Sequence, residues 1–349
     1  MRDGPIHPAV AANGPSTPRQ VVLLTDAAMD RHASPGHPER PERRTAAAHG
    51  VRDAATLADA TLDEPALQPL DQEAIERVHT QGYIEALDAA EARGGGWLDP
   101  DTYLVPGSMH AARLAAAATV EAAMAVARGA AVAFAVVRPP GHHAFPSTGL
   151  GFCLLNHVAI AVGALRAAGV AQRIAIVDWD VHHGNGTQAI FDADPELCYL
   201  STHQWPFYPG TGAAEERGRG AAAGTKHNAP LAAGSGDEAF LAAWREELLP
   251  AVREFRPQAI LASAGYDAHR DDPLAELRVT EGGYRELGRL VGDVARELGL
   301  PGVALTLEGG YDAHALRASV AASVIGILDG LVGDGTGEAH RSSGVTGGG

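Results

Sequence analysis

Short apolar runs alternate with longer helical patterns along most of this 349-residue chain. The runs are apolar on both faces, as expected for strands of a parallel sheet that is covered by helices on both sides. They predict strands at 21–25, 131–137, 173–178, 197–202, 259–265 and 303–310. Helical patterns lie between them near 107–128, 153–168, 237–255 and 281–298, with Asp237 as the N-cap of the third helix and Thr280 at the start of the fourth. This alternation predicts right-handed crossovers and an α/β fold with a central, mainly parallel sheet flanked by helices.

The organisation along the chain favours one domain. Residues 1–19 and 333–349 are rich in small and polar residues, and we predict a disordered arm and a disordered tail there. The folded domain is expected to cover residues 20–332. Two smaller domains are the alternative, but no convincing linker divides this range.

The amino-acid composition limits which ligands the protein is expected to bind and where in the cell it is expected to be. A formal net charge of −16 argues against nucleic-acid binding and favours neutral or cationic ligands. No apolar run approaches roughly 18 residues, so we expect no membrane span, and the N-terminal stretch has no apolar signal region, so we expect the cytoplasm. Cys153 and Cys198 lie in apolar runs and are predicted to be buried free thiols.

Polar clusters follow four of the predicted strands. Their sequences are RPPGHHA (138–144), DWDVHHGNGT (178–187), YDAH (266–269) and EGGYD (308–312). In open α/β sheets, ligands bind beyond the carboxyl ends of the strands. We therefore expect these four clusters to meet at one edge of the sheet and to form a single site.

The second and third clusters contain a set of metal ligands. Asp180 and His182 stand at positions i and i+2 of an extended segment, where their side chains point the same way, and Asp267 can join them from a neighbouring strand. Two carboxylates and one imidazole suit a catalytic zinc ion, with ferrous iron as the alternative. If these residues were only strand-end caps, the gathering of so many ionisable groups at apolar strand ends would be unexplained.

His142 and His143 are adjacent imidazoles that need partners to set their protonation. Asp178 and Asn185 flank the metal motif and are the candidate partners. A carboxylate favours the charged form of an imidazole, whereas an amide oxygen mainly fixes its orientation, so the two histidines are expected to have different roles. Tyr311 follows two glycines and can reach a substrate oxygen to stabilise an oxyanion, although a strand-end Tyr can also be a packing residue.

Together, these motifs resemble the zinc-dependent histone deacetylase and acetylpolyamine amidohydrolase family. The resemblance spans nearly the whole chain outside its tails and rests on HPERPER (37–43), RPPGHHA (138–144), GFCLLN (151–156), DWDVHHGNGTQ (178–188), FYPGTG (207–212), SAGYDAH (263–269) and EGGY (308–311). Asn185, in GNG, matches the bacterial and class II branch, where other branches have Asp. The resemblance implies the single-domain arginase–deacetylase fold.

The resemblance also implies a role for each site residue. Asp180, His182 and Asp267 would hold zinc, and a potassium or sodium ion would lie near Asp178, Asp180, His182 and Ser201. His143 would be the general base that activates water and then protonates the leaving amine, with His142 and Asp178 as an electrostatic pair. Tyr311 would polarise the acetyl carbonyl. Gly151, Phe152 and Tyr208 would line a narrow substrate tunnel, and Arg43 would guide acetate through an internal cavity.

The implied activity is hydrolysis of the acetamide of an acetylated lysine peptide or protein, or of a small acylated amine. Leu274 stands where polyamine-specific relatives carry a carboxylate at the pocket rim, which favours acyl-lysine over acetylpolyamine. Asp99 and Asp101 are alternative rim carboxylates or solvated turn residues. A non-catalytic acyl-lysine binder and an arginase-like dimanganese hydrolase are more remote, because Tyr311 and the zinc ligands are kept and no second ligand set is found. The family includes both monomers and homo-oligomers.

Overall fold

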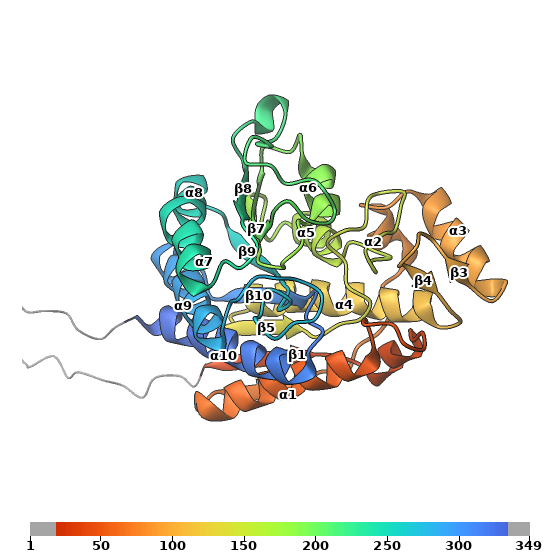
Figure 1. Ribbon diagram of the computed structural model, residues 1–349, viewed down its shortest axis with the longest axis horizontal. Coiled ribbons are helices and arrows are strands. Elements are labelled where there is room, and N and C mark those ends of the chain that lie inside the picture. Colours follow the sequence, from red (N-terminus) through yellow and green to blue (C-terminus); the bar gives the residue numbers. More distant parts are fainter. Residues whose placement is uncertain (1–18, 334–349) are drawn as a thin grey trace, which may run out of the picture.

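The computed structural model describes residues 19–333. Nearly all of the predicted arm and tail, residues 1–18 and 334–349, lies outside this range. The described chain folds around one eight-stranded sheet in which every neighbouring pair of strands is parallel (Figure 1). In sheet order its strands are β2 (Thr61–Asp63), β1 (Gln20–Leu24), β5 (Val132–Ala135), β10 (Val303–Leu307), β9 (Ala259–Ala264), β6 (Ile174–Asp178), β7 (Leu197–Gln204) and β8 (Lys226–Leu231).

Helices cover both faces of this sheet. On one side α4 (Ser108–Ala127) packs against the central strands and against α5 (His157–Ala167), while α10 (Ala313–Val332) packs between α1 (Pro41–Leu57) and α9 (Glu281–Glu297) on the other. The predicted α/β architecture is therefore confirmed. The shorter elements are η1 (Ala27–Arg31), α2 (Gln72–Glu76), α3 (Gln81–Ala92), the hairpin β3 (Gly96–Trp97) and β4 (Tyr103–Leu104), α6 (Asn185–Phe191), η2 (Gly220–Ala222), α7 (Asp237–Ala243), η3 (Trp244–Leu248) and α8 (Leu249–Phe255).

All six predicted strands are present, with shifts of a few residues at their ends. The largest shift is at β10, which ends at Leu307, so that Glu308–Gly310 form a loop. The edge strand β8 was not predicted because its sequence, KHNAPL, is polar and contains a proline. An edge strand needs hydrogen bonds on one side only, and β8 pairs with β7 alone, so this sequence can still form a strand.

The predicted N-cap at Asp237 is wrong. Gly236 caps α7, and Asp237 is the first residue of the helix. Its carboxylate instead accepts hydrogen bonds from the backbone N–H (2.8 Å) and the hydroxyl (2.6 Å) of Thr280. Thr280 is the N-cap of α9, as predicted, because its Oγ1 accepts from Gly283 N at 3.3 Å. Asp237 therefore joins the starts of two helices.

One described helix, α10, is long and apolar enough to cross a membrane by length and composition, although no such segment was expected. Most of its apolar stretch, 61%, is buried inside the protein, where α10 contacts α1 and α9. A core helix of this fold needs the same composition, because it is surrounded by other helices and the sheet.

Candidate active site

Four adjacent strands carry the site. β5, β10, β9 and β6 lie side by side in the sheet, and the polar clusters predicted at strand ends follow their carboxyl ends. The order of strands along the chain reverses here, since β9 and β10 insert between β5 and β6. Such a reversal opens a crevice at the end of the sheet. The four clusters therefore meet, as the sequence predicts.

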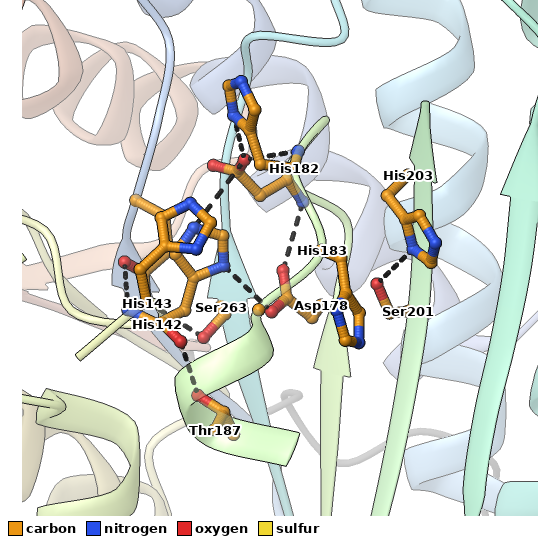
Figure 2. Close-up of polar contacts among 12 residues, drawn as sticks. His142, His143, Asp178, His182, His183, Thr187, Ser201, His203 and Ser263 are labelled. Atoms are coloured by element: carbon orange, nitrogen blue, oxygen red, sulfur yellow. Dashed lines mark hydrogen bonds and ion pairs between the residues drawn. The ribbon is translucent and has the colours of Figure 1, made fainter. Parts of the chain in front are cut away.

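Asp180, His182 and Asp267 converge on one point. Nδ1 of His182 lies 3.1 Å from Oδ1 of Asp180 and 3.2 Å from Oδ2 of Asp267, and the candidate ligand atoms of all three residues lie within 4.8 Å of one another. Both carboxylates are almost completely buried. Figure 2 shows His182 above the end of β6, apart from the histidine pair described below.

The hydrogen bonds of these carboxylates leave one position for a cation. Oδ2 of Asp180 accepts from Gly309 N at 2.7 Å, and Oδ1 of Asp267 accepts from Val181 N at 2.9 Å. Oδ2 of Asp267 is buried and has no hydrogen-bond donor. A buried carboxylate oxygen without a donor is costly unless a cation lies beside it. The donor set therefore fits a metal ion.

Glycines let the backbone approach these ligands closely. A Cβ atom on Gly309 would lie 1.9 Å from Oδ2 of Asp267, and one on Gly265 would lie 2.0 Å from Oδ2 of Asp180. No side chain larger than hydrogen fits at either position. The EGGY and SAGYD motifs thus have a steric reason for their glycines.

His142 and His143 lie side by side, with ring centroids 4.1 Å apart (Figure 2). His142 Nδ1 is 3.1 Å from Oδ2 of Asp178, and His143 Nδ1 is 2.8 Å from Oδ1 of Asn185. Each imidazole therefore has the partner that the sequence suggests.

These partners separate the protonation states of the two rings. Burial lowers the pKa of His142, but the charges of Asp178, Asp180 and Glu308 outweigh it and raise the pKa to about 10. Burial and the positive charge of His142 hold the pKa of His143 well below 6.5. His142 is therefore cationic at neutral pH and His143 is neutral. Because His143 Nδ1 donates to Asn185, its Nε2 carries a lone pair that can accept a proton.

Tyr311 enters the site beyond Gly309 and Gly310, and its backbone N–H donates to Oδ2 of Asp272 at 2.7 Å. Burial raises the pKa of its phenol well above 10, so the hydroxyl stays protonated and can donate a hydrogen bond. The guanidinium carbon of Arg43 lies 4.7 Å from the Tyr311 ring centroid, and Arg43 Nε donates to Gly310 O at 2.6 Å. Arg43 is thus buried directly behind the tyrosine loop.

A cavity of about 270 Å³ leads to these groups. The four residues predicted to contact substrate, Gly151, Phe152, Tyr208 and Leu274, all line it, together with Tyr311 and the two histidines. A Cβ atom on Gly151 would lie 2.5 Å from His143 Cδ2 and 2.9 Å from the Tyr208 hydroxyl. Gly151 therefore lets the chain pass between these two side chains.

The two rim carboxylates have different positions. Asp101 lines the cavity, whereas Asp99 does not. Oδ1 of Asp99 accepts from the backbone N–H groups of Asp101 (3.0 Å) and Thr102 (2.6 Å), so Asp99 is a turn residue. Burial and the neighbouring Asp99 carboxylate raise the pKa of Asp101 to about 6.

The residues predicted for a monovalent cation also lie together. Asp178 in β6 is the register partner of Ser201 in β7, and Asp180 and His182 follow within four residues of Asp178. Ser201 Oγ is 2.9 Å from Nδ1 of His203, as Figure 2 shows.

Three further residues support the site and were not predicted. Oε2 of Glu308 accepts from the backbone N–H groups of Gly141 (2.7 Å) and His142 (3.1 Å), which fixes the histidine loop. The Tyr199 hydroxyl donates to Oδ2 of Asp178 at 2.9 Å. Phe207 stacks on the His182 ring, with centroids 5.4 Å apart. Glu308 and Phe207 stand in the quoted motifs, but the contact between Tyr199 and Asp178 depends on strand register, which has no local signal.

Comparison with known proteins identifies the class. The histone deacetylase domain matches residues 37–327, so this chain belongs to the histone deacetylase family. Members of this family are generally metal-dependent, which agrees with the cluster of Asp180, His182 and Asp267. Family membership makes the protein a hydrolase of the deacetylase and amidohydrolase type.

Individual relatives and a solved structure agree with this family assignment. A probable deacetylase of Archaeoglobus fulgidus is 41% identical over 293 residues, which is 83% of this chain and 80% of the relative. A histone deacetylase-like amidohydrolase of Pseudomonas aeruginosa is 36% identical over 296 residues, 84% of this chain and 77% of the relative. The crystal structure of the HDA15 HD domain superposes with a TM-score of 0.82 at 35% identity, covering 89% of this chain and 88% of that one. The predicted family and fold are confirmed.

Proposed function

We propose that this protein is a zinc-dependent deacetylase that hydrolyses the acetamide of an acetylated lysine side chain, or of a similar acylated amine, to the free amine and acetate. The observation that carries the proposal is the convergence of three metal ligands, one neutral and one cationic histidine, and a protonated tyrosine at the inner end of one cavity. Each group has a task in amide hydrolysis that it can perform in its observed position.

Zinc suits the ligand set best. Asp180, His182 and Asp267 offer two carboxylate oxygens and one imidazole nitrogen, which leaves positions open for water and substrate. When bound, the ion would act as a Lewis acid toward the amide carbonyl and would lower the pKa of water. Ferrous iron accepts a similar ligand set and is the alternative ion.

The protein's own residues handle the proton and the developing charge. Nε2 of His143 takes a proton from the attacking water and returns it to the departing amine nitrogen. His142, kept cationic by Asp178, stabilises the negative charge that develops nearby. The Tyr311 hydroxyl donates a hydrogen bond to the carbonyl oxygen as the tetrahedral intermediate forms. Cleavage of the C–N bond then yields acetate and the free amine.

Acetylated lysine is favoured over acetylpolyamine by Leu274. This apolar side chain lines the cavity at the position where polyamine-specific relatives are expected to carry a carboxylate. Asp101 supports the alternative, an acetylpolyamine amidohydrolase, because its carboxylate also lines the cavity and can attract a distal ammonium group.

Two measurements on the purified full chain test the proposal. Chelation is expected to remove amide hydrolysis and added zinc to restore it; full activity in a metal-free preparation would refute the metal requirement. A kinetic panel of acetyl-lysine peptides, acetylated polyamines and small acylated metabolites then identifies the substrate. A wide margin in favour of acetylpolyamines would overturn the preference inferred from Leu274.

A further inference from the structure

His37, in the HPERPER motif, has no part in the chemistry above, yet its imidazole makes specific contacts. Nε2 lies 3.1 Å from the carbonyl oxygen of Asp101, which can only accept, so the proton is on Nε2. Nδ1 then accepts from the backbone N–H of Glu39 at 3.1 Å. One side chain thus joins the loop before α1 to the turn between β3 and β4, although 64 residues separate His37 from Asp101.

The same ring packs against the wall of the cavity. Its edge meets Phe152, with ring centroids 4.6 Å apart and an interplanar angle of 78°. On another side it meets Tyr103, at 4.8 Å and 72°. Edge-to-face contacts of this kind are favourable and restrict how the rings turn. His37 therefore contacts two other segments, the β3–β4 hairpin and the segment that carries Phe152.

Phe152 needs such support because its backbone is strained. Its φ is +68°, in the left-handed region that bulky side chains rarely adopt. A residue stays there only if the surrounding structure holds it. Thr102 contributes directly, since its buried Oγ1 accepts from Phe152 N at 3.0 Å. Thr102 follows Asp101 in the turn that His37 holds.

We propose that His37, acting with Thr102, is a positioning residue for the outer wall of the substrate tunnel. It holds Phe152 and Asp101, which both line the cavity that the stem of the acylated amine would occupy. It does not touch the reacting atoms. This inference rests on the proposed function for the nature of the ligand, but its structural content concerns ligand binding rather than turnover.

The test compares two hydroxamates that share a metal-binding group. Acetohydroxamic acid reaches only the inner end of the cavity, whereas octanehydroxamic acid also fills the tunnel. With zinc-loaded full-length protein and calorimetry, His37→Ala and Thr102→Val are each expected to weaken octanehydroxamic acid about tenfold and acetohydroxamic acid by less than about twofold. With an acetyl-lysine peptide, KM is expected to rise about tenfold while kcat changes by less than about threefold.

Matched variants separate positioning from general damage. Thr102→Ser keeps the hydroxyl and is expected to bind both hydroxamates like the wild type, unlike the isosteric Thr102→Val. His37→Gln keeps a donor for Asp101 O and is expected to retain part of the affinity. His110→Ala, at an exposed histidine in α4, is the control. If His37→Ala does not fold, the affinities of His37→Gln, Thr102→Ser and Thr102→Val for the two hydroxamates provide the same test.

Equal losses for the two hydroxamates, or no loss for either, would overturn the role of His37. So would a Thr102→Ser variant as weak as Thr102→Val. A wild-type protein that binds both hydroxamates but hydrolyses no acylated amine would instead refute the proposed function, and the binding comparison would still decide the role of His37.

Discussion

Glu39 and Arg138 form a bidentate ion pair in which both side chains are completely buried, with Nε and Nη2 of the guanidinium each 2.6 Å from a carboxylate oxygen. Nη1 of Arg43 lies 3.0 Å from the same carboxylate. The pair joins the HPERPER motif to the loop that carries His142 and His143. Two motifs whose paired residues lie 99 positions apart are thus held together beneath the site.

Removing the charge of Glu39 should destabilise the protein. Glu39→Gln keeps the shape of the side chain but removes the only carboxylate of Arg43 among the described residues and the bidentate partner of Arg138, which is left with Asp30 at 3.9 Å. Removing one partner of a buried ion pair typically costs about 3–5 kcal/mol. Urea unfolding measures this loss. Glu42→Gln, in the same motif but 70% exposed, is the control and should change the free energy of unfolding by less than about 0.5 kcal/mol. Equal stabilities of the two variants would contradict the prediction.

The same pair predicts acid sensitivity. Burial raises the pKa of Glu39, but Arg138 and Arg43 outweigh it and lower the pKa from 4.5 to about 2. Because the folded pKa lies below the unfolded one, the stabilisation is fully present above pH 4.5 and is lost as the pH falls toward 2. The difference corresponds to about 3 kcal/mol. Unfolding midpoints measured across this range should fall more steeply in the wild type than in Glu39→Gln, and parallel curves would count against the assignment.

Two variants are expected to distinguish loss of the metal ion from loss of the general base. Asp180→Asn removes a ligand oxygen, so bound metal and activity are expected to fall together. His143→Ala should keep its metal and lose about 10²- to 10⁴-fold in kcat, because only the general base is removed. Metal analysis and kinetics on the same preparations, with circular dichroism to verify folding, make the comparison. Full activity in either variant would rule out the proposed mechanism.

Gly151 should tolerate no side chain. In Gly151→Ala the new methyl group would meet His143 and the Tyr208 hydroxyl, and φ at this position is +56°. We expect a loss of kcat/KM of about tenfold or more and a destabilisation of about 1 kcal/mol. Gly163→Ala in α5 is the matched control, since its Cβ would meet Arg77 only at an ordinary 3.5 Å. A fully active Gly151→Ala would show that the tunnel is wider than this geometry allows.

Leu274 should influence the choice of substrate. Leu274→Glu adds a carboxylate to the cavity wall and should raise the kcat/KM of an acetylpolyamine relative to an acetyl-lysine peptide about tenfold, through attraction of the distal ammonium. Leu274→Gln introduces a side chain with the shape of Glu but without its charge, and it is expected to leave this ratio unchanged. The measurement is kcat/KM for both substrates at low and high salt. Identical ratios of kcat/KM for acetylpolyamine to acetyl-lysine peptide in Leu274→Glu and Leu274→Gln would exclude an electrostatic role.

Local patterns in the sequence predicted six of the eight strands of the sheet, the helical segments near 107–128, 153–168, 237–255 and 281–298, and the chemical character of the site. Apolar runs such as 173–178 report burial on both faces, and ligand-type residues such as Asp180 and Asp267 follow directly after them. Helices α1, α3 and α10 and strands β2 and β8 are among the elements that were not predicted. The mostly buried α10 and the polar edge strand β8 lack the usual periodicity of apolar residues.

The sequence predicts that the four polar clusters meet, but only the tertiary structure decided the order of the strands and the contacts made by residues outside those clusters. The insertion of β9 and β10 between β5 and β6 brings Asp267 and Tyr311 to the histidine pair. No local sequence pattern predicts this order of the strands. The same holds for the contacts of Tyr199 with Asp178 and of His37 with Asp101, and for the different positions of Asp99 and Asp101. Periodicity reports the environment of one segment, whereas a hydrogen bond across tens of residues depends on how all the segments pack.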